Sequence, residues 1–233
     1  MATFVGSLIS IQLDVLLARD AHGRLTTTRD PAACPAPRLF LGRSGEENVW
    51  AVRGDVDPAT RDELERLCSA EPKFDVSHAK QDPSCRERAR DLLAPVELEW
   101  RGPAYVLPEE LPRDDRAREV AADDRAAWNE AFPWLAEDFE ALAPVVIAFE
   151  AGQPAAVCHS PRGCTDAAAE AGVETLEAFR GRGLATAAVA CWAHAVQRSG
   201  RLALYSTSWQ NTASQAVARR LAARLYGEDW HLS

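Results

Sequence analysis

The sequence lacks the short motifs that mark several large enzyme classes. It has no H-E-x-x-H pair of a metalloprotease, no G-x-S-x-G elbow of a serine hydrolase and no G-x-x-x-x-G-K-[ST] loop of a Walker-type ATPase. The cysteines form no C-x-x-C pair and have no histidine at zinc spacing. We therefore expect no metal site and interpret the cysteines as buried thiols. They are Cys34, Cys68, Cys85, Cys158, Cys164 and Cys191.

The chain also lacks an excess of positive charge and a run long enough to span a membrane. Its formal net charge is −9, which disfavours nucleic-acid binding because that binding depends on Lys and Arg neutralising phosphates. The apolar opening has no basic start and contains Asp14, unlike a signal peptide. We expect a cytoplasmic protein that binds neither nucleic acid nor a membrane, and a homodimer is left open.

What is present is enough apolar material for one main domain and a smaller one. The chain has 233 residues, of which 47% are hydrophobic. We place the boundary near Pro95, between a small N-terminal α/β unit (1–95) and the main domain (96–233). Because every recognisable ligand-binding feature lies after residue 170, we expect the N-terminal unit to cap or shape a substrate site.

Local patterns define the elements of the N-terminal unit. The apolar runs 38–42 and 48–52 flank a polar turn and predict a hairpin. Asp57 and Pro58 are suited to be the N-cap and first residue of a helix, and a second short helix is predicted to end near Leu93.

The main domain reads as strand, helices, three strands, helix, strand, helix. The predicted segments are a strand at 100–107, a helical region at 114–142 broken at Pro133, two strands within 144–160, a third strand at 169–179, a helix at 183–200 closed by Gly200, a strand at 201–208 and a last helix at 212–226.

The most informative stretch is FRGRGLAT, residues 179–186. A G-x-G turn between a strand and a helix lets the unpaired N–H groups of the helix N-terminus converge on an anion. A dinucleotide-binding fold is disfavoured, because Thr186 stands where its third glycine belongs.

A cluster of arginines follows this turn in a chain that is otherwise acidic. Residues 180–226 contain seven arginines and no Asp, Glu or Lys. A solvated helix face would look similar, but beside a glycine-rich helix start we favour a phosphate ligand. The arginines are Arg180, Arg182, Arg198, Arg201, Arg219, Arg220 and Arg224.

The run RGRGLA at 180–185 resembles the (Q/R)-x-x-G-x-(G/A) signature of the GNAT superfamily, the CoA-dependent N-acetyltransferases. The family's order of strand, signature, helix, strand, asparagine and helix matches this chain over roughly residues 100–230. The resemblance implies an α/β (α+β) fold with a mixed central sheet flanked by helices, here with the smaller N-terminal α/β unit. It also implies acetyl-CoA as co-substrate.

The resemblance also implies where acetyl-CoA binds. In the family, the strand before the signature hydrogen-bonds the pantetheine arm through its backbone, which here falls on Val173, Glu174 and Thr175. Asn211 is similar to the asparagine that commonly contacts CoA, and it is equally suited to cap the last helix. The signature loop would hold the pyrophosphate through Arg180, Gly181, Arg182, Gly183, Leu184, Ala185 and Thr186.

One position departs from the family pattern. Many members carry a tyrosine seven residues after the asparagine, where it protonates the leaving thiolate, but this chain has Ala218 there. Solvent, Ser214 or Tyr205 are the alternatives, and the sequence does not decide between them.

Direct attack of an amine on the acetyl thioester needs a group that takes a proton. We expect Glu170 as the general base and Glu174 as the second candidate, since alternate residues of one strand share a face. His159 is more consistent with a packed histidine than with a catalytic one.

Three functions compete. The leading hypothesis is an acetyl-CoA-dependent N-acetyltransferase with an unidentified amine acceptor. The alternative is a catalytically degenerate GNAT-like protein that binds CoA or an acyl-CoA as a regulatory ligand, and the third is a structural α/β protein whose glycine-rich turn only permits tight packing.

Overall fold

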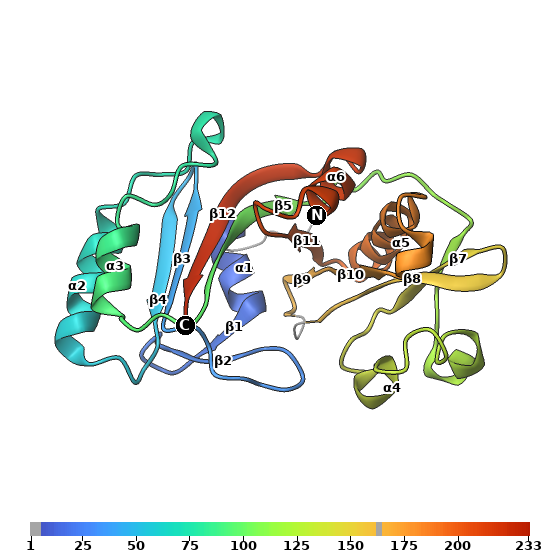
Figure 1. Ribbon diagram of the computed structural model, residues 1–233, viewed down its shortest axis with the longest axis horizontal. Helices are drawn as coiled ribbons and strands as arrows, with labels where there is room; N and C mark the ends of the chain where they lie inside the picture. Colours follow the sequence, from blue (N-terminus) through green and yellow to red (C-terminus); the bar gives the residue numbers. More distant parts are fainter. Residues whose placement is uncertain (1–5, 162–164) are drawn as a thin grey trace. The chain divides into compact units, whose positions relative to one another are not determined.

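A computed structural model describes residues 6–161 and 165–233, and they form two compact units (Figure 1). Unit 1 comprises Val106–Tyr205 and Ala213–Arg224. Unit 2 comprises residues 6–105 together with the segments Ser206–Thr212 and Leu225–Ser233. Each unit therefore contains segments that are far apart in the sequence. The division into 1–95 and 96–233 stays a prediction.

Unit 2 is built on strands in the order β4-β3-β12-β5. Strand β3 pairs antiparallel with both β4 and β12. The bounds of its elements are α1 Leu8–Leu16, β1 Leu17–Arg19, β2 Leu25–Thr28, β3 Leu39–Ser44, β4 Asn48–Val52, α2 Pro58–Ser69, the 3₁₀ turn η1 Val76–His78, α3 Arg86–Leu92, β5 Glu99–Val106 and β12 Arg224–Leu232.

Helices cover both faces of these strands. Leu64 of α2 and Ala89 of α3 pack with Leu39 and Trp230 in one buried cluster, whereas Leu13 of α1 belongs to a second one. Helix α2 begins where the sequence predicts, because the Asp57 side chain accepts a hydrogen bond from the Thr60 N–H at 3.0 Å. The predicted hairpin and the short helix before Leu93 are also confirmed.

Unit 1 contains a four-stranded antiparallel sheet in the order β10-β8-β7-β6, and a parallel pair formed by β9 and β11. Its element bounds are β6 Ala117–Glu119, η2 Ala122–Ala127, α4 Leu135–Asp138, β7 Val146–Glu150, β8 Gln153–His159, β9 Ala168–Glu170, β10 Gly172–Thr175, η3 Glu177–Phe179, α5 Leu184–Arg198, β11 Leu202–Ser206 and α6 Thr212–Arg220. The mixed α/β fold expected from the sequence is confirmed.

Helix α5 packs against strands β6, β7, β8 and β10, and Figure 1 shows it beside β8 and β10. Its alanines leave room for close contact, and Ala188, Ala193 and Trp192 are fully buried. Gly200, two residues beyond the helix, has a φ of +80°, so the predicted glycine stop is confirmed.

The predicted helical region 114–142 is wrong for most of its length. Residues Ala117–Glu119 form strand β6, which pairs antiparallel with β7, and only the short η2 and α4 are helical. Val120, Trp128 and Phe132 lie in one buried cluster with Ile147 and Val157 of β7 and β8. Packing on the sheet and pairing with β7 therefore override the local helical preference of this alanine- and glutamate-rich stretch.

Two further predictions need correction. The single strand expected at 169–179 is two strands, β9 and β10, which belong to different sheets. The last helix, expected to reach Tyr226, ends at Arg220, and Ala222 turns the chain with a φ of +50°. Strand β12 follows this turn. The sequence analysis did not predict it, because its partner β3 lies in a distant part of the chain.

In the described ranges 6–161 and 165–233, none of the helices combines the length and apolar character needed to cross a bilayer.

Candidate functional site

The loop before α5 presents a row of backbone donors. Gly181 and Gly183 have φ values of +78° and +81°, a conformation that L-residues with side chains rarely adopt. Gly183 is the N-cap of α5, and no side chain caps the helix. From Gly181 to Thr186, no backbone N–H donates to a backbone acceptor within the described part of the chain. These N–H groups and the helix dipole favour an anion at this position.

A pocket of about 310 Å³ opens on this loop, and its lining combines donors with positive charge. Thr186 is one of the lining residues, and its Oγ1 is buried without a hydrogen-bond partner among the described residues. The residues that line it are Pro112, Arg113, Asp114, Arg116, Gly181, Gly183, Thr186, Ala187, Ala190 and Arg220.

Two of the arginines in this pocket were missed by the sequence reading. Arg113 and Arg116 come from the segment before β6, about 65 residues ahead of the loop, and only folding brings them to it. Arg116 donates to the Arg182 carbonyl at 3.3 Å and forms an ion pair with Asp114 at 2.7 Å. That ion pair holds the pKa of Asp114 below its ordinary value.

The arginine-rich segment is only partly gathered at this pocket. Arg220 lines it, and Arg182 lies 3.6 Å from Glu150 and stacks over the Phe179 ring at 5.4 Å. Arg198, by contrast, forms a 2.8 Å ion pair with Glu119. Arg198 is therefore a surface ion-pair partner. This agrees with the alternative interpretation of the segment as a solvated helix face.

The strand that precedes the loop changes sheets at Ala171. Up to Glu170 it pairs with β11, and the Ala171 N–H donates to the Leu204 carbonyl at 3.0 Å. From Gly172 onward it pairs with β8 instead. Strands β10 and β11 therefore part from one another at this point. Strand β10 is the edge of its sheet, so the strand edge that carries Val173, Glu174 and Thr175 has outward backbone groups available to a ligand.

The two glutamates expected as bases lie in different surroundings. Glu170 is 6% exposed and lies at the end of β9, next to the point where the strands part. Glu174 is exposed on β10, opposite Val157. Because the chain changes sheets between them, the regular alternation that placed both on one face does not extend from Glu170 to Glu174. Their catalytic roles stay predictions.

His159 is buried, as the simpler interpretation holds. Its ring meets the Trp134 ring edge-on at 5.0 Å, and its Nδ1 has no partner among the described residues. Burial lowers the pKa of His159 to about 4, so the ring is neutral at pH 7.

Two of the alternatives for the missing tyrosine lie side by side. The Tyr205 hydroxyl on β11 is 2.6 Å from the Ser214 Oγ on α6. Tyr205 follows Leu204, the last residue of β11 paired with β9. Ala218 is fully buried. The fold therefore brings the hydroxyls of Tyr205 and Ser214 together.

Asn211 lies in the Ser206–Thr212 segment of unit 2, directly before α6. Its N–H donates to the Ser208 Oγ at 3.2 Å. The segment runs so close to β5 that a Cβ on Gly102 would come within 1.7 Å of the Thr207 carbonyl oxygen, and only glycine fits there. The contact of Asn211 with CoA stays a prediction.

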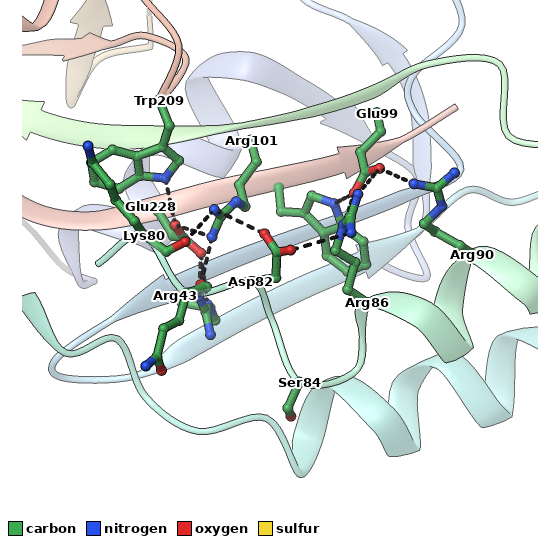
Figure 2. Close-up of polar contacts among 12 residues, drawn as sticks. Arg43, Lys80, Asp82, Ser84, Arg86, Arg90, Glu99, Arg101, Trp209 and Glu228 are labelled. Atoms are coloured by element: carbon green, nitrogen blue, oxygen red, sulfur yellow. Dashed lines mark hydrogen bonds and ion pairs between the residues drawn. The ribbon is translucent and has the colours of Figure 1, made fainter. Parts of the chain in front are cut away.

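A buried charge network in unit 2 holds this segment (Figure 2). Trp209 donates its indole N–H to Glu228 at 2.9 Å. Glu228 is fully buried and also contacts Arg43 and Arg101. Burial raises the pKa of Glu228, while the charges of the two arginines act against that shift.

Glu71 joins the same network through Arg43 at 2.7 Å. Burial acts to raise the pKa of Glu71, but hydrogen bonds from Ser84 and the Cys85 N–H outweigh burial and hold the pKa below its ordinary value. Because its acids and cations are paired with one another, we assign this network a structural role.

The cysteines are only partly as predicted. Cys68, Cys85 and Cys158 are buried, whereas Cys191 is partly exposed and Cys34 is exposed. Burial raises the pKa of the Cys158 thiol. Cys164 lies outside the described residues. Within the described ranges, no group of three or more His, Cys, Asp or Glu side chains is arranged to hold a metal ion.

The described residues form a mixed α/β protein in which a helix start is suited to an anion. Residues 109–223 match the model of the acetyltransferase (GNAT) family. The chain therefore carries a GNAT-family acetyltransferase domain, and the resemblance noted in the sequence is confirmed.

Several solved structures resemble this chain in fold. One is a GNAT-family protein from Novosphingobium aromaticivorans, at 17% identity over 59% of this chain and 65% of that chain, with a TM-score of 0.48. Another is an acetyltransferase from Colwellia psychrerythraea, at 12% identity over 79% of this chain and 76% of that chain, with a TM-score of 0.49.

A third similar structure is an aminoglycoside N-acetyltransferase in complex with CoA, at 23% identity over 45% of this chain and 88% of that chain, with a TM-score of 0.36. None of these similarities is strong enough to indicate a substrate. No curated protein matches the sequence.

Proposed function

We propose that this protein transfers the acetyl group of acetyl-CoA to an amine of a small molecule or protein. The observation that carries the proposal is the helix start at Gly183, where unpaired N–H groups and the unpartnered Thr186 hydroxyl line one pocket with three arginines. That donor set suits a pyrophosphate, and the family is one of acetyltransferases.

The reaction is a direct transfer. The neutral amine nitrogen attacks the thioester carbonyl carbon, the C–S bond breaks, and the products are an amide and the CoA thiol. One proton leaves the nitrogen and one is taken up by the sulfur. The outward backbone groups of β10 are suited to hold the pantetheine arm. An N–H group near the parting of β10 and β11 would polarise the carbonyl.

We assign the general base to Glu170 and the proton route to the sulfur to the Tyr205–Ser214 pair. Glu170 and Tyr205 both lie next to the point where the two strands part, and Ser214, whose hydroxyl meets that of Tyr205, is a partly exposed residue. A proton donated by Tyr205 can thus be replaced from Ser214 and then from solvent.

The hydroxyl pair is tested with Tyr205→Phe, which keeps the ring and removes the donor. We expect kcat to fall by roughly 10-fold to 100-fold, with unchanged acetyl-CoA affinity. The loss should be smaller with an activated acetyl thioester of low thiol pKa, because such a leaving group needs no proton. An equal loss with both thioesters would contradict the assignment.

The CoA site is tested by isothermal titration with acetyl-CoA. Gly183→Glu puts a side chain and a negative charge at the helix start, so we expect affinity to fall by more than roughly 100-fold. The matched control is Gly200→Glu at the other end of α5. Gly200 has nearly the same φ of +80° and nothing within 4 Å of a Cβ, so both variants carry a similar backbone strain of about 1–2 kcal/mol.

Unchanged acetyl-CoA affinity in folded Gly183→Glu would sink the proposed cofactor site. Release of free thiol in the presence of a panel of amines then tests turnover. Tight binding without thiol release from any amine would instead favour a regulatory CoA-binding protein.

A further inference from the structure

A second pocket, of about 350 Å³, lies wholly within unit 2. The β1–β2 turn contributes His22, Gly23 and Arg24, strand β4 contributes Trp50, Ala51 and Val52, and helix α2 contributes Arg61 and Glu65. The acetyltransferase signature and the proposed catalytic residues contribute nothing to this lining. The volume is in the range of small-molecule sites.

The side-chain donors of Arg24, Trp50 and Arg61 in this pocket have no close acceptor in the part of the chain that the structure describes. The Arg61 side chain is only 17% exposed, yet its one contact with a carboxylate is 3.7 Å to the neighbouring, largely exposed Asp62. The Arg24 guanidinium and the Trp50 indole N–H, both on half-buried residues, have no hydrogen-bond acceptor among the residues that the structure describes.

Two nearby arginines outside the pocket do have protein acceptors for their guanidinium groups. Arg66, also on α2, forms two 2.8 Å hydrogen bonds with Glu63, and Arg53 binds both Asp55 oxygens and the Ala36 carbonyl. Sheltered guanidinium groups without acceptors are costly unless a ligand or water satisfies them. Arg24 and Arg61 thus differ from Arg53 and Arg66 in that their guanidinium donors are left to a ligand or water.

The residues that line the pocket also restrict the chemical class of the ligand. Two guanidinium groups suit a carboxylate, which they bind in a planar, forked geometry. Glu65 disfavours a dianion such as a phosphate, because it adds a like charge to the same lining. Trp50 offers a flat apolar surface that suits an aromatic ring.

We propose that this pocket binds a small aromatic monocarboxylate, with its carboxylate on Arg24 and Arg61 and its ring against Trp50. The site is separate from the acetyl-CoA pocket and does not depend on the proposed transfer reaction.

The test titrates the full chain with three probes: 2-naphthoate, its neutral analogue 2-naphthamide, and inorganic phosphate. We expect saturable binding of 2-naphthoate and binding of the other two weaker by about tenfold or more, since a charge-assisted hydrogen bond is worth about 1.5–3 kcal/mol. Arg61→Gln and Arg24→Gln should each weaken 2-naphthoate by a similar factor. The matched control Arg66→Gln should not, and acetyl-CoA affinity should be unchanged in all three.

Absence of saturable 2-naphthoate binding to the parent chain would overturn the proposal, as would parent-like affinity in Arg61→Gln. Phosphate binding as tightly as 2-naphthoate would refute the monocarboxylate class. Trp50→Leu, checked for folding by its thermal midpoint, should weaken 2-naphthoate more than it weakens acetate. Equal weakening of both would contradict the role of the indole.

Discussion

At the scale of single residues, the surroundings of a side chain decide its chemistry. His159 is next to Cys158 in the sequence, and nothing in that pair indicates whether its ring is charged. Packed against Trp134 at the end of β8, the ring has no partner for Nδ1 and a pKa lowered to about 4. The ring is therefore neutral at pH 7.

The lowered pKa of His159 leads to a prediction about how the free energy of unfolding depends on pH. Between the unfolded pKa of about 6.5 and the folded pKa of about 4, the unfolded chain binds more protons at this residue, so its contribution to stability is lost as the pH falls. We expect His159→Gln to abolish up to about 3 kcal/mol of pH dependence between pH 7 and pH 4.

The measurement is urea unfolding of the parent and the variant at each pH. The difference between the two isolates His159 from Glu228, whose raised pKa acts in the opposite direction. The control His22→Gln changes an exposed histidine of unit 2 and is measured in the same way. Parallel curves for His159→Gln and the parent would show that burial does not shift this group.

At the scale of secondary-structure elements, the switch of sheets at Ala171 is the central feature of unit 1. It ends the pairing of β9 with β11, begins that of β10 with β8, and leaves β10 as an edge strand. The switch also gives the two glutamates different environments, with Glu170 buried and Glu174 exposed.

This difference predicts which glutamate matters for the rate. Glu170→Gln keeps the shape of the side chain and removes the base, so we expect kcat to fall by roughly 100-fold while acetyl-CoA affinity is retained. The matched variant Glu174→Gln should stay near the parent rate. The acidic limb of the pH–rate profile should disappear in Glu170→Gln only. A slow Glu174→Gln beside a parent-like Glu170→Gln would assign the base to Glu174.

At the scale of the whole molecule, a strand from the N-terminal region pairs with the C-terminal strand within unit 2. Strand β12 pairs with β3 from Leu232–Leu39 to Gly227–Ser44, and Glu228 is buried against Arg43. Residues before Pro95 therefore complete their sheet with the C-terminal strand. A division of the chain near Pro95 would place β3 and its partner β12 in different parts.

A fragment of residues 96–233 should consequently fold poorly by itself. It leaves β12 without β3 and Glu228 without Arg43, and removing one partner of a buried ion pair costs about 3–5 kcal/mol, a large part of a typical total stability. We expect aggregation or a strongly lowered thermal midpoint. Co-expression of residues 1–95 as a separate chain should restore a soluble complex.

The opposite result would support the boundary near Pro95. A monomeric 96–233 fragment that unfolds cooperatively at the temperature of the full chain would show that the N-terminal residues are an accessory unit. Acetyl-CoA titration of that fragment would then reveal whether it keeps the cofactor site.

The sequence by itself determined the features that depend on neighbours along the chain. The Asp57 N-cap, the glycine turn at 181–183 and the Gly200 stop each need only a local conformation, so residue type was enough to predict them. The acetyltransferase signature is of the same kind, since its donors are consecutive backbone N–H groups.

Only the tertiary structure decided the features that join distant segments. Arg116 reaches the loop from a segment that was predicted to be helical, and Arg113 directly precedes that segment. Strand β12 was not predicted because its partner β3 lies in a distant part of the chain. Strand pairing and burial supply the free energy in these cases, and they depend on residues that no local window contains.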